Sequence, residues 1–348
     1  MSTYNTSREE IAIVSFVELT PAEASQLDEI ETIQTIVSRA TDGAGIARDR
    51  IGFTVSGSCD MLVGRPFSWI MAMDGAGVSK PIEESHVEMD GAWALYEAWV
   101  RLQHGDIDAA LIYSFGANAA EDLMQVLALQ LDPYYLAPTG INAAEVAALQ
   151  ASAMLAGGAT ERQFAEVAVR AGLAVSVEAA LAEPYTNRPL RASDLPRFSD
   201  GAVAMVIARG DYARSVCARP AWIQSMAHIA DSHSLGVRDL SKAPSLEKAA
   251  RLAGVGEKPT DLVEVHAPFG PQEVLAIEAL RAAGLHGTAA LNPSGGTRAA
   301  QSVMVAGLAA IGRAASAIHR GEASRTVGHA SSGPALQHNL IAVLEERS

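Results

Sequence analysis

Two histidines stand where acid–base chemistry could occur. His266 follows a short apolar run, Leu262–Val265, which predicts a buried strand, and His329 lies toward the end of a second such run, residues 325–330. Imidazole is the side chain whose ordinary pKa lies closest to neutrality, so either ring can act as a general base or as a hydrogen-bond donor. The alternative is that each ring makes only structural hydrogen bonds in the core.

Two carboxylates precede a predicted helix. Residues 91–103 have helical periodicity, and Glu88 and Asp90 come directly before them. The positive end of a helix dipole stabilises a carboxylate at this position. Glu88 can therefore be a catalytic group or a helix cap, and we expect Asp90 to contact a substrate.

Polar loops at strand ends carry the binding residues of many α/β proteins. Paired glycines within residues 291–296 permit positive φ or a close approach of the backbone, and two serines follow the strand that contains His329. We expect substrate contacts from these two loops, at the following residues: Asn292, Ser294, Gly295, Gly296, Ser331 and Ser332.

The elements that must position these residues occur twice. A helix followed by a strand is predicted at residues 91–103 and 109–114, and again at residues 303–318 and 325–330. The two copies align residue for residue, with these pairs: Gly105 with Gly321, Gly91 with Gly307, and Tyr113 with His329. Such a repeat predicts two halves of one topology, whereas the alternative is two unrelated helix–turn–strand units.

The repeat also predicts how the chain divides. The N-terminal half spans residues 1–217 and contains a mostly helical region at about residues 117–197, and the C-terminal half spans residues 218–348. Residues 142–156 and 160–174 are the clearest helices of that region, and residues 184–196 are predicted to be an irregular segment that covers a ligand.

The composition of the chain argues against several classes of function. The 348 residues are 49% hydrophobic and carry a formal net charge of −14, which disfavours binding to nucleic acid or to anionic membranes. No apolar run has the length of a membrane span, and residues 1–10 lack the shape of a signal peptide, so we expect a cytoplasmic protein. Cys59 and Cys217 provide neither a disulfide framework nor the spacing of a metal site.

Two motifs carry a resemblance to a known family. Residues 263–269 and 292–296 resemble the His-Asp-Ala-Phe and Asn-Pro-Ser-Gly-Gly motifs of thiolases, in the forms typical of sterol-carrier-protein thiolases and the bacterial lipid-transfer-protein group. Ala267 stands where that bacterial group has aspartate, so His266 needs another orienting partner. The resemblance implies a thiolase-like five-layer αβαβα sandwich of two similar halves that dimerises through its N-terminal half.

The reactive residues of thiolases are replaced. The nucleophilic cysteine falls at Glu88, the histidine of the Gly-His-Pro motif falls at Gln301 or Ser302, and the second cysteine falls in residues 328–333. Covalent acyl transfer needs an activated thiolate, so we do not expect it here. Cys217 is expected to pack in the core, and Cys59 could serve only if it has moved into the site.

Some members of the lipid-transfer-protein group resemble aldolases that shorten steroid side chains as CoA thioesters. A retro-aldol cleavage needs a base, donors for the enolate and an acid, but no nucleophile. We therefore expect a lyase for a β-hydroxyacyl-CoA, with Glu88, His266 and His329 converging on one pocket and coenzyme A present only as part of the substrate.

Two alternatives stay open. One is a catalytically silent subunit that binds an acyl-CoA, and the other is an acyl-CoA acyltransferase that uses Cys59. The resemblance also implies a homodimer, or a complex with an OB-fold, zinc-ribbon partner that helps to hold the CoA ester.

Overall fold

The computed structural model describes residues 9–64, 66–77, 83–116 and 123–347. Before residue 117 the elements are β1 (Ile11–Leu19), α1 (Pro21–Ala24), α2 (Glu29–Ala44), β2 (Phe53–Gly57), α3 (Asp60–Val63), α4 (Ser68–Ala76), β3 (Glu83–Val87), α5 (Gly91–Leu102) and β4 (Ala109–Gly116). A mostly helical region follows, with α6 (Leu123–Ala128), α7 (Ala143–Ala156), α8 (Glu161–Arg170), α9 (Val177–Ala182) and the short strands β5 (Tyr185–Asn187) and β6 (Leu190–Arg191).

The chain then completes the first half and builds the second. The first half ends with β7 (Gly201–Arg209) and α10 (Gly210–Val216). The second half contains β8 (Ala221–Ala230), α11 (Pro244–Leu252), β9 (Leu262–Val265), α12 (Gly270–Ala282), β10 (Ala290–Leu291), α13 (Ala306–His319), β11 (Arg325–Ser332) and β12 (His338–Glu345). The predicted division at residues 217 and 218 falls between α10 and β8.

The two halves have the same sheet topology. Their strands run in the orders β3-β2-β4-β7-β1 and β10-β9-β11-β12-β8, and the two parts meet through a short antiparallel pairing of β1 with β8. In each half the first three strands are parallel and the last two are antiparallel to their neighbours. The repeat expected from the sequence is therefore present.

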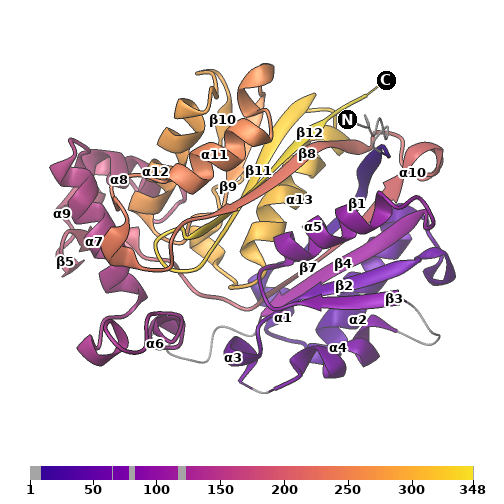
Figure 1. Ribbon diagram of the computed structural model, residues 1–348, viewed down its shortest axis with the longest axis horizontal. Coiled ribbons are helices and arrows are strands. Elements are labelled where there is room, and N and C mark those ends of the chain that lie inside the picture. The colour runs from indigo at the N-terminus through magenta and orange to yellow at the C-terminus, as the bar shows by residue number, and fades with distance from the viewer. Residues whose placement is uncertain (1–8, 65, 78–82, 117–122, 348) are drawn as a thin grey trace, which may run out of the picture.

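Alternating side chains divide the core into layers. On β1, Ile11 and Ile13 face a core built around α5 and α13, whereas Ala12 and Val14 face a second core built on α2. A third core joins the far face of β9, β11 and β12 to α11, α12, α7 and α8. Figure 1 shows α5 and α13 between the two sheets, with the remaining helices outside, which confirms the five-layer αβαβα sandwich.

Glycine allows each of the two central helices, α5 and α13, to start in close contact with a strand of its own half. A Cβ on Gly91 would lie 2.7 Å from Cβ of Ser114, and a Cβ on its counterpart Gly307 would lie 2.6 Å from Cβ of Ala330. Ser114 and Ala330 occupy equivalent places on β4 and β11, which correspond end to end under the same offset. Both contacts are shorter than a side chain could tolerate, so glycine is required at both helix starts.

Local sequence explains most element bounds. Capping boxes at Thr20, Asn142 and Thr160 start α1, α7 and α8. The helix predicted at residues 160–174 ends earlier, at Arg170, because Gly172 has a φ of +68°. The helix predicted at residues 303–318 begins only at Ala306, because Met304 has a φ of +73°.

The helical region lies beside the C-terminal half (Figure 1). The predicted helical stretch of residues 117–197 is seen from residue 123 onward, and its first six residues lie outside the described residues. Residues 184–196 contain β5 and β6, and Tyr185 and Arg191 bind Glu161 of α8. This segment does not line the cavity described below. None of the helices in the described residues has both the length and the apolar character needed to cross a bilayer.

Candidate functional site

A cavity of about 100 Å³ lies where the C-terminal ends of β9 and β11 approach α6 and α7. Most of its wall is apolar and comes from Leu127, Ala128, Leu131, Ala143, Val146, Phe198, Pro268, Phe269, Val303, Met304, Pro334, Ala335 and Leu336. The polar part comes from Asp90, Gln130, His266, Gln272, Gln301, Ser331 and Ser332. Of the sequence-predicted site residues, Asp90, His266, Ser331 and Ser332 therefore line this cavity.

His266 is held rigidly at the cavity wall. It follows the last residue of β9, is 4% exposed, and its main-chain N–H donates to the carbonyl of His329 at 3.2 Å. The Ser331 hydroxyl donates to the His266 carbonyl at 3.0 Å. Burial lowers the pKa of His266 to about 3, and nearby His329 acts in the same direction. The ring is therefore neutral at physiological pH.

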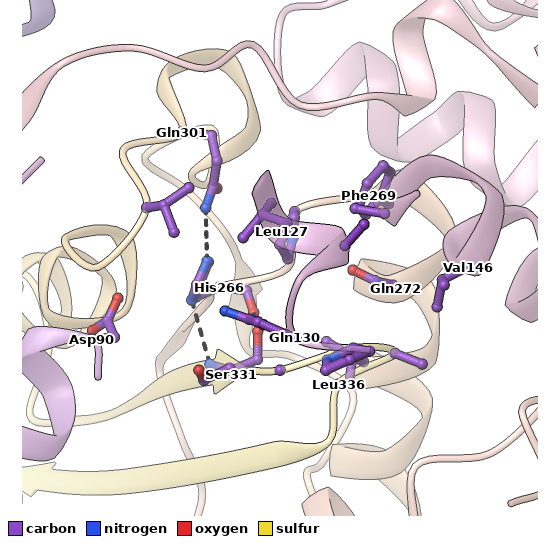
Figure 2. Close-up of a pocket in the computed structure, with 18 of the residues that line it drawn as sticks. Asp90, Leu127, Gln130, Val146, His266, Phe269, Gln272, Gln301, Ser331 and Leu336 are labelled. Carbon is purple, nitrogen blue, oxygen red and sulfur yellow. Dashed lines mark hydrogen bonds between the residues drawn. The ribbon is translucent and has the colours of Figure 1, made fainter. Parts of the chain in front are cut away.

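The contacts of the His266 ring assign its tautomer. The Ser331 backbone N–H lies 3.4 Å from Nδ1, and the Gln301 side-chain amide lies 3.0 Å from Nε2 (Figure 2). A backbone N–H can only donate, so Nδ1 accepts and Nε2 carries the proton of the neutral ring. Gln301 then presents its oxygen to Nε2, which a half-turn of its amide achieves, since the two ends of the amide are nearly equal in size. Gln301 thus supplies the orienting partner that Ala267 cannot.

Asp90 caps both central helices at once. Its Oδ1 accepts from the N–H groups of Ala92 at 2.8 Å and Leu308 at 3.0 Å, and its Oδ2 accepts from Gly307 at 2.8 Å. The first donor belongs to α5 and the other two belong to the first turn of α13. One carboxylate therefore satisfies backbone groups at two helix N-termini, where the two dipoles also favour negative charge.

The charge state of Asp90 results from opposing effects. Burial raises the pKa of Asp90 to about 7, and the three backbone N–H groups act in the opposite direction. Asp90 and His266 are the two titratable side chains on the cavity wall as far as the described residues go. Figure 2 places both on the side of the cavity away from Val146 and Gln272.

His329 lies beneath the site instead of in it. The side chain is fully buried, and its Nε2 lies 3.0 Å from Oδ1 of Asn339. Asn339 in turn donates to the Leu336 carbonyl at 2.8 Å, which fixes its oxygen toward the histidine, so His329 is protonated at Nε2. Burial lowers the pKa of His329 to about 4, although the bond to Asn339 opposes this shift. His329 does not line the cavity.

The loop of residues 292–296 supports the end of β9. Asn292 Oδ1 accepts from the Val265 N–H at 2.6 Å, directly before His266. The Ser294 hydroxyl donates to Glu264 at 2.7 Å, and Gly295 and Gly296 have positive φ. These four loop residues, which were expected to bind substrate, lie outside the cavity wall and position the strand that carries His266.

Comparisons with known proteins agree with this architecture. An acetyl-CoA acetyltransferase from Methanothermobacter thermautotrophicus is 28% identical over 308 residues, which cover 77% of this chain and 79% of that protein. The solved Ltp2-ChsH2(DUF35) aldolase matches with a TM-score of 0.76 at 18% identity, over 97% of this chain and 98% of that one. The chain has the thiolase fold.

Further solved structures support this conclusion. Human mitochondrial 3-ketoacyl-CoA thiolase matches this thiolase-fold protein with a TM-score of 0.76 at 13% identity, over 97% of this chain and 99% of that one. The Bacillus anthracis acetyl-CoA acetyltransferase matches with a TM-score of 0.76 at 14% identity, over 98% and 99% of the two chains. No family model matches the sequence.

Glu88 stands where the resemblance places the thiolase cysteine, but its side chain is half exposed and outside the cavity wall. One oxygen accepts from the Asp60 N–H at 2.6 Å and the other lies 2.9 Å from Nε2 of His86. Burial raises the pKa of the neighbouring Cys59 thiol, and Glu88 adds to that effect. Of Glu88, His266 and His329, therefore, only His266 lines the cavity of this thiolase-fold protein, and Cys59 does not line it.

None of the three glutamines on the cavity wall, Gln130, Gln272 and Gln301, is among the site residues that the sequence predicts. Gln301 had been noted only as the place of a lost histidine, although a glutamine there keeps a hydrogen-bonding group at the same point. For Gln272 the available signal was its position three residues after Phe269, in the first turn of α12, because the first turn of a helix points toward the strand ends that hold the site.

Proposed function

We propose that this thiolase-fold protein binds an acyl-CoA thioester in the cavity and cleaves a β-hydroxyacyl-CoA by a retro-aldol reaction without a cysteine nucleophile. The observation that carries the proposal is the polar end of the cavity. It combines a neutral, oriented histidine with a buried carboxylate, and no cysteine of the described residues lines the wall. The similarity to the Ltp2-ChsH2(DUF35) aldolase supports the same reaction.

His266 is assigned the role of hydrogen-bond donor. A ring with a pKa of about 3 is a poor base at neutral pH, but its fixed Nε2–H can stabilise negative charge that develops on an oxygen. When substrate binds, the thioester oxygen would replace Gln301 as acceptor or share this N–H. Because the ring is buried and already oriented, little reorganisation is needed as the enolate forms.

Asp90 is assigned the role of base, in place of Glu88. Its Oδ2 accepts only one of the three backbone hydrogen bonds, so this oxygen can accept one more. Asp90 takes the proton of the β-hydroxyl, the bond between the α and β carbons breaks, and a ketone leaves. The bonding electrons form the thioester enolate, whose α carbon then takes the proton back from Asp90. A pKa of about 7 suits both proton transfers near neutrality.

The size of the cavity limits what part of the substrate it encloses. Sites that bury drug-sized ligands occupy about 300–1,000 Å³. A cavity of about 100 Å³ fits the reacting end of an acyl chain, so a steroid ring system would extend beyond it. A steroid-derived acyl group therefore stays part of the proposal only with its rings outside this cavity.

The proposed assembly is a homodimer or a complex with a second protein. The buried run of residues 109–115 lies in β4, which is enclosed between β2 and β7, so it cannot form the contact. Within the described residues, the free edge of the N-terminal half is β3, which pairs with β2 on one side only. The name of the Ltp2-ChsH2(DUF35) aldolase joins two components, which supports a partner in trans.

A silent acyl-CoA-binding subunit is the second candidate. The observation that favours it is the absence of Glu88 and His329 from a wall that is mostly apolar. In that case Asp90 acts only as a helix cap and His266 only as a structural donor. The two candidates predict the same binding but different turnover.

The deciding experiment supplies a β-hydroxyacyl-CoA with a tertiary hydroxyl and follows release of the ketone. His266→Ala is expected to lose turnover on the order of 10²-fold or more, because it removes the proposed enolate donor. The value of kcat/KM should rise as pH increases through about 7, because the base must be deprotonated. Glu88→Gln is the matched control and should cleave at the wild-type rate.

The outcomes separate the candidates. Binding of the thioester without ketone release, alone and with a co-expressed partner, would support the silent subunit. Wild-type rates in His266→Ala would remove His266 from the mechanism. Loss of turnover in Glu88→Gln would restore the site first expected from the sequence.

A further inference from the structure

A chain of amide groups leads from the protein interior to the apolar end of the cavity. Gln150 in α7 is fully buried, and its Nε2 donates to the carbonyl of Ala335 at 3.3 Å. Gln272 in α12 is 4% exposed, and its Nε2 donates to Oε1 of Gln150 at 2.8 Å. The Gln272 oxygen has no hydrogen-bond partner among the described residues.

The direction of this chain is fixed at its inner end. The backbone carbonyl of Ala335 can only accept a hydrogen bond, and Arg238 donates to it as well. Gln150 must therefore turn its amide nitrogen toward Ala335 and its oxygen toward Gln272. Gln272 must then turn its nitrogen toward Gln150, which leaves its oxygen as the free end. Neither amide can rotate without losing a buried hydrogen bond.

The free oxygen stands in apolar surroundings. Figure 2 shows Gln272 beside Phe269 and Val146, on the opposite side of the cavity from Asp90. A buried acceptor without a partner is unfavourable, and a ligand that supplies a donor removes this cost. A ligand that offers a second acceptor, such as a ketone, would instead place two oxygens against each other.

We propose that Gln272 is a specificity-determining residue, which selects ligands that carry a hydrogen-bond donor such as a hydroxyl group at the apolar end of the cavity. The selected group would lie on the acyl portion, away from the reacting end near Asp90 and His266. This assignment to an acyl chain rests on the proposed function, whereas the selection of a donor rests only on the amide chain and the cavity.

The test uses three small probes that differ at one position: cyclopentanol, cyclopentanone and cyclopentane. Dissociation constants are measured by titration while the side-chain amide resonances of the glutamines are followed by NMR. The alcohol should bind wild-type protein about tenfold more tightly than either other probe, because it satisfies the free oxygen. Binding of the alcohol should shift the resonances of Gln272 most.

Variants separate the amide chain from general effects of the wall. Gln272→Met should bind all three probes with similar affinity, because the acceptor is gone while the volume is nearly kept. Gln150→Met frees the Gln272 amide to rotate, so the ketone should bind as tightly as the alcohol. Gln224→Met, which makes the same chemical change at an exposed position of β8 outside the cavity wall, should keep the wild-type preference.

Several results would overturn the proposal. These are equal binding of the three probes to wild type, an unchanged preference in Gln272→Met, or no binding of any probe in the cavity. Each result is independent of CoA chemistry. A protein that prefers the alcohol through Gln272 but never cleaves an acyl-CoA would contradict the proposed reaction alone, and cleavage without any preference would contradict the selectivity alone.

Discussion

Replacing Asp90 with asparagine tests the electrostatics at the centre of the molecule. The change keeps the shape of the side chain but removes its ability to titrate. In the wild type, burial raises the pKa of Asp90 from 3.8 to about 7. Between these two values the folded protein holds a proton that the unfolded chain has released, so the free energy of unfolding falls as pH rises through this window.

The size of the effect follows from the pKa. Between about pH 5.5 and about pH 8.5 the wild type should lose about 2 kcal/mol of unfolding free energy through this group, since each pKa unit corresponds to about 1.4 kcal/mol. The Asp90→Asn variant lacks this loss. All other titrating groups are common to both proteins and cancel in the difference. The stability advantage of wild type over variant should therefore be larger at the lower pH by about 2 kcal/mol.

Urea unfolding followed by tryptophan fluorescence, to which Trp93 and Trp99 of α5 contribute, gives the two free energies at each pH. Asp28→Asn is the control, because Asp28 caps α2 at the surface and asparagine caps about as well as aspartate. An advantage that grows with pH would mean that the two helix N-termini outweigh burial. In that case Asp90 is a permanent anion and the reasoning that makes it a base near neutrality fails.

Three further predictions concern the rest of the site and the assembly. The ring resonances of His266 and His329 should not titrate between about pH 8 and pH 5, because burial holds both pKa values well below this range, and titration near the ordinary value of histidine would contradict their burial. Cys59→Ala should leave any ketone release unchanged, whereas an acyl adduct on Cys59 after incubation with an acyl-CoA would establish the acyltransferase alternative. Sedimentation at micromolar concentration should show a dimer or a complex, and a stable monomer with and without a co-expressed partner would contradict the proposed assembly.

The fold could be predicted because its signals are local and repeated. The apolar run Leu262–Val265 defined β9 to the residue, and the helices predicted at residues 91–103 and 142–156 differ from α5 and α7 by one residue at one end. Setting Gly91 against Gly307 aligned the halves, because both positions need a glycine for the same steric reason. These signals depend on residues that are neighbours in the sequence, or on a constant offset between the two halves. Both can be recognised in a single sequence.

The candidate site was predicted less well because it depends on which side chains point into the cavity, and a single sequence does not show this. His329 and Ser331 point to the same face of β11, but a step of two residues in a strand spans about 7 Å, and only Ser331 reaches the cavity. Glu88 lies three residues and Asp90 one residue before the start of α5, yet Glu88 lies at the surface and Asp90 is buried between the two central helices. The hydrogen bond between Gln150 and Gln272 joins two segments that are far apart in the sequence, so no local sequence pattern indicates it.

The double cap at Asp90 also limits which residue can occupy the equivalent position in the second half. Its counterpart in the second half is Ala306, a buried alanine. An aspartate at position 306 would compete for the N–H groups of Ala92 and Leu308, which already donate to Asp90. It would also place two carboxylates in one buried space, where like charges repel. A perfectly symmetrical molecule could therefore not fill both places with charge. The two equivalent positions accordingly hold different residues, an aspartate and an alanine, so the start of the central helices carries one buried carboxylate instead of two.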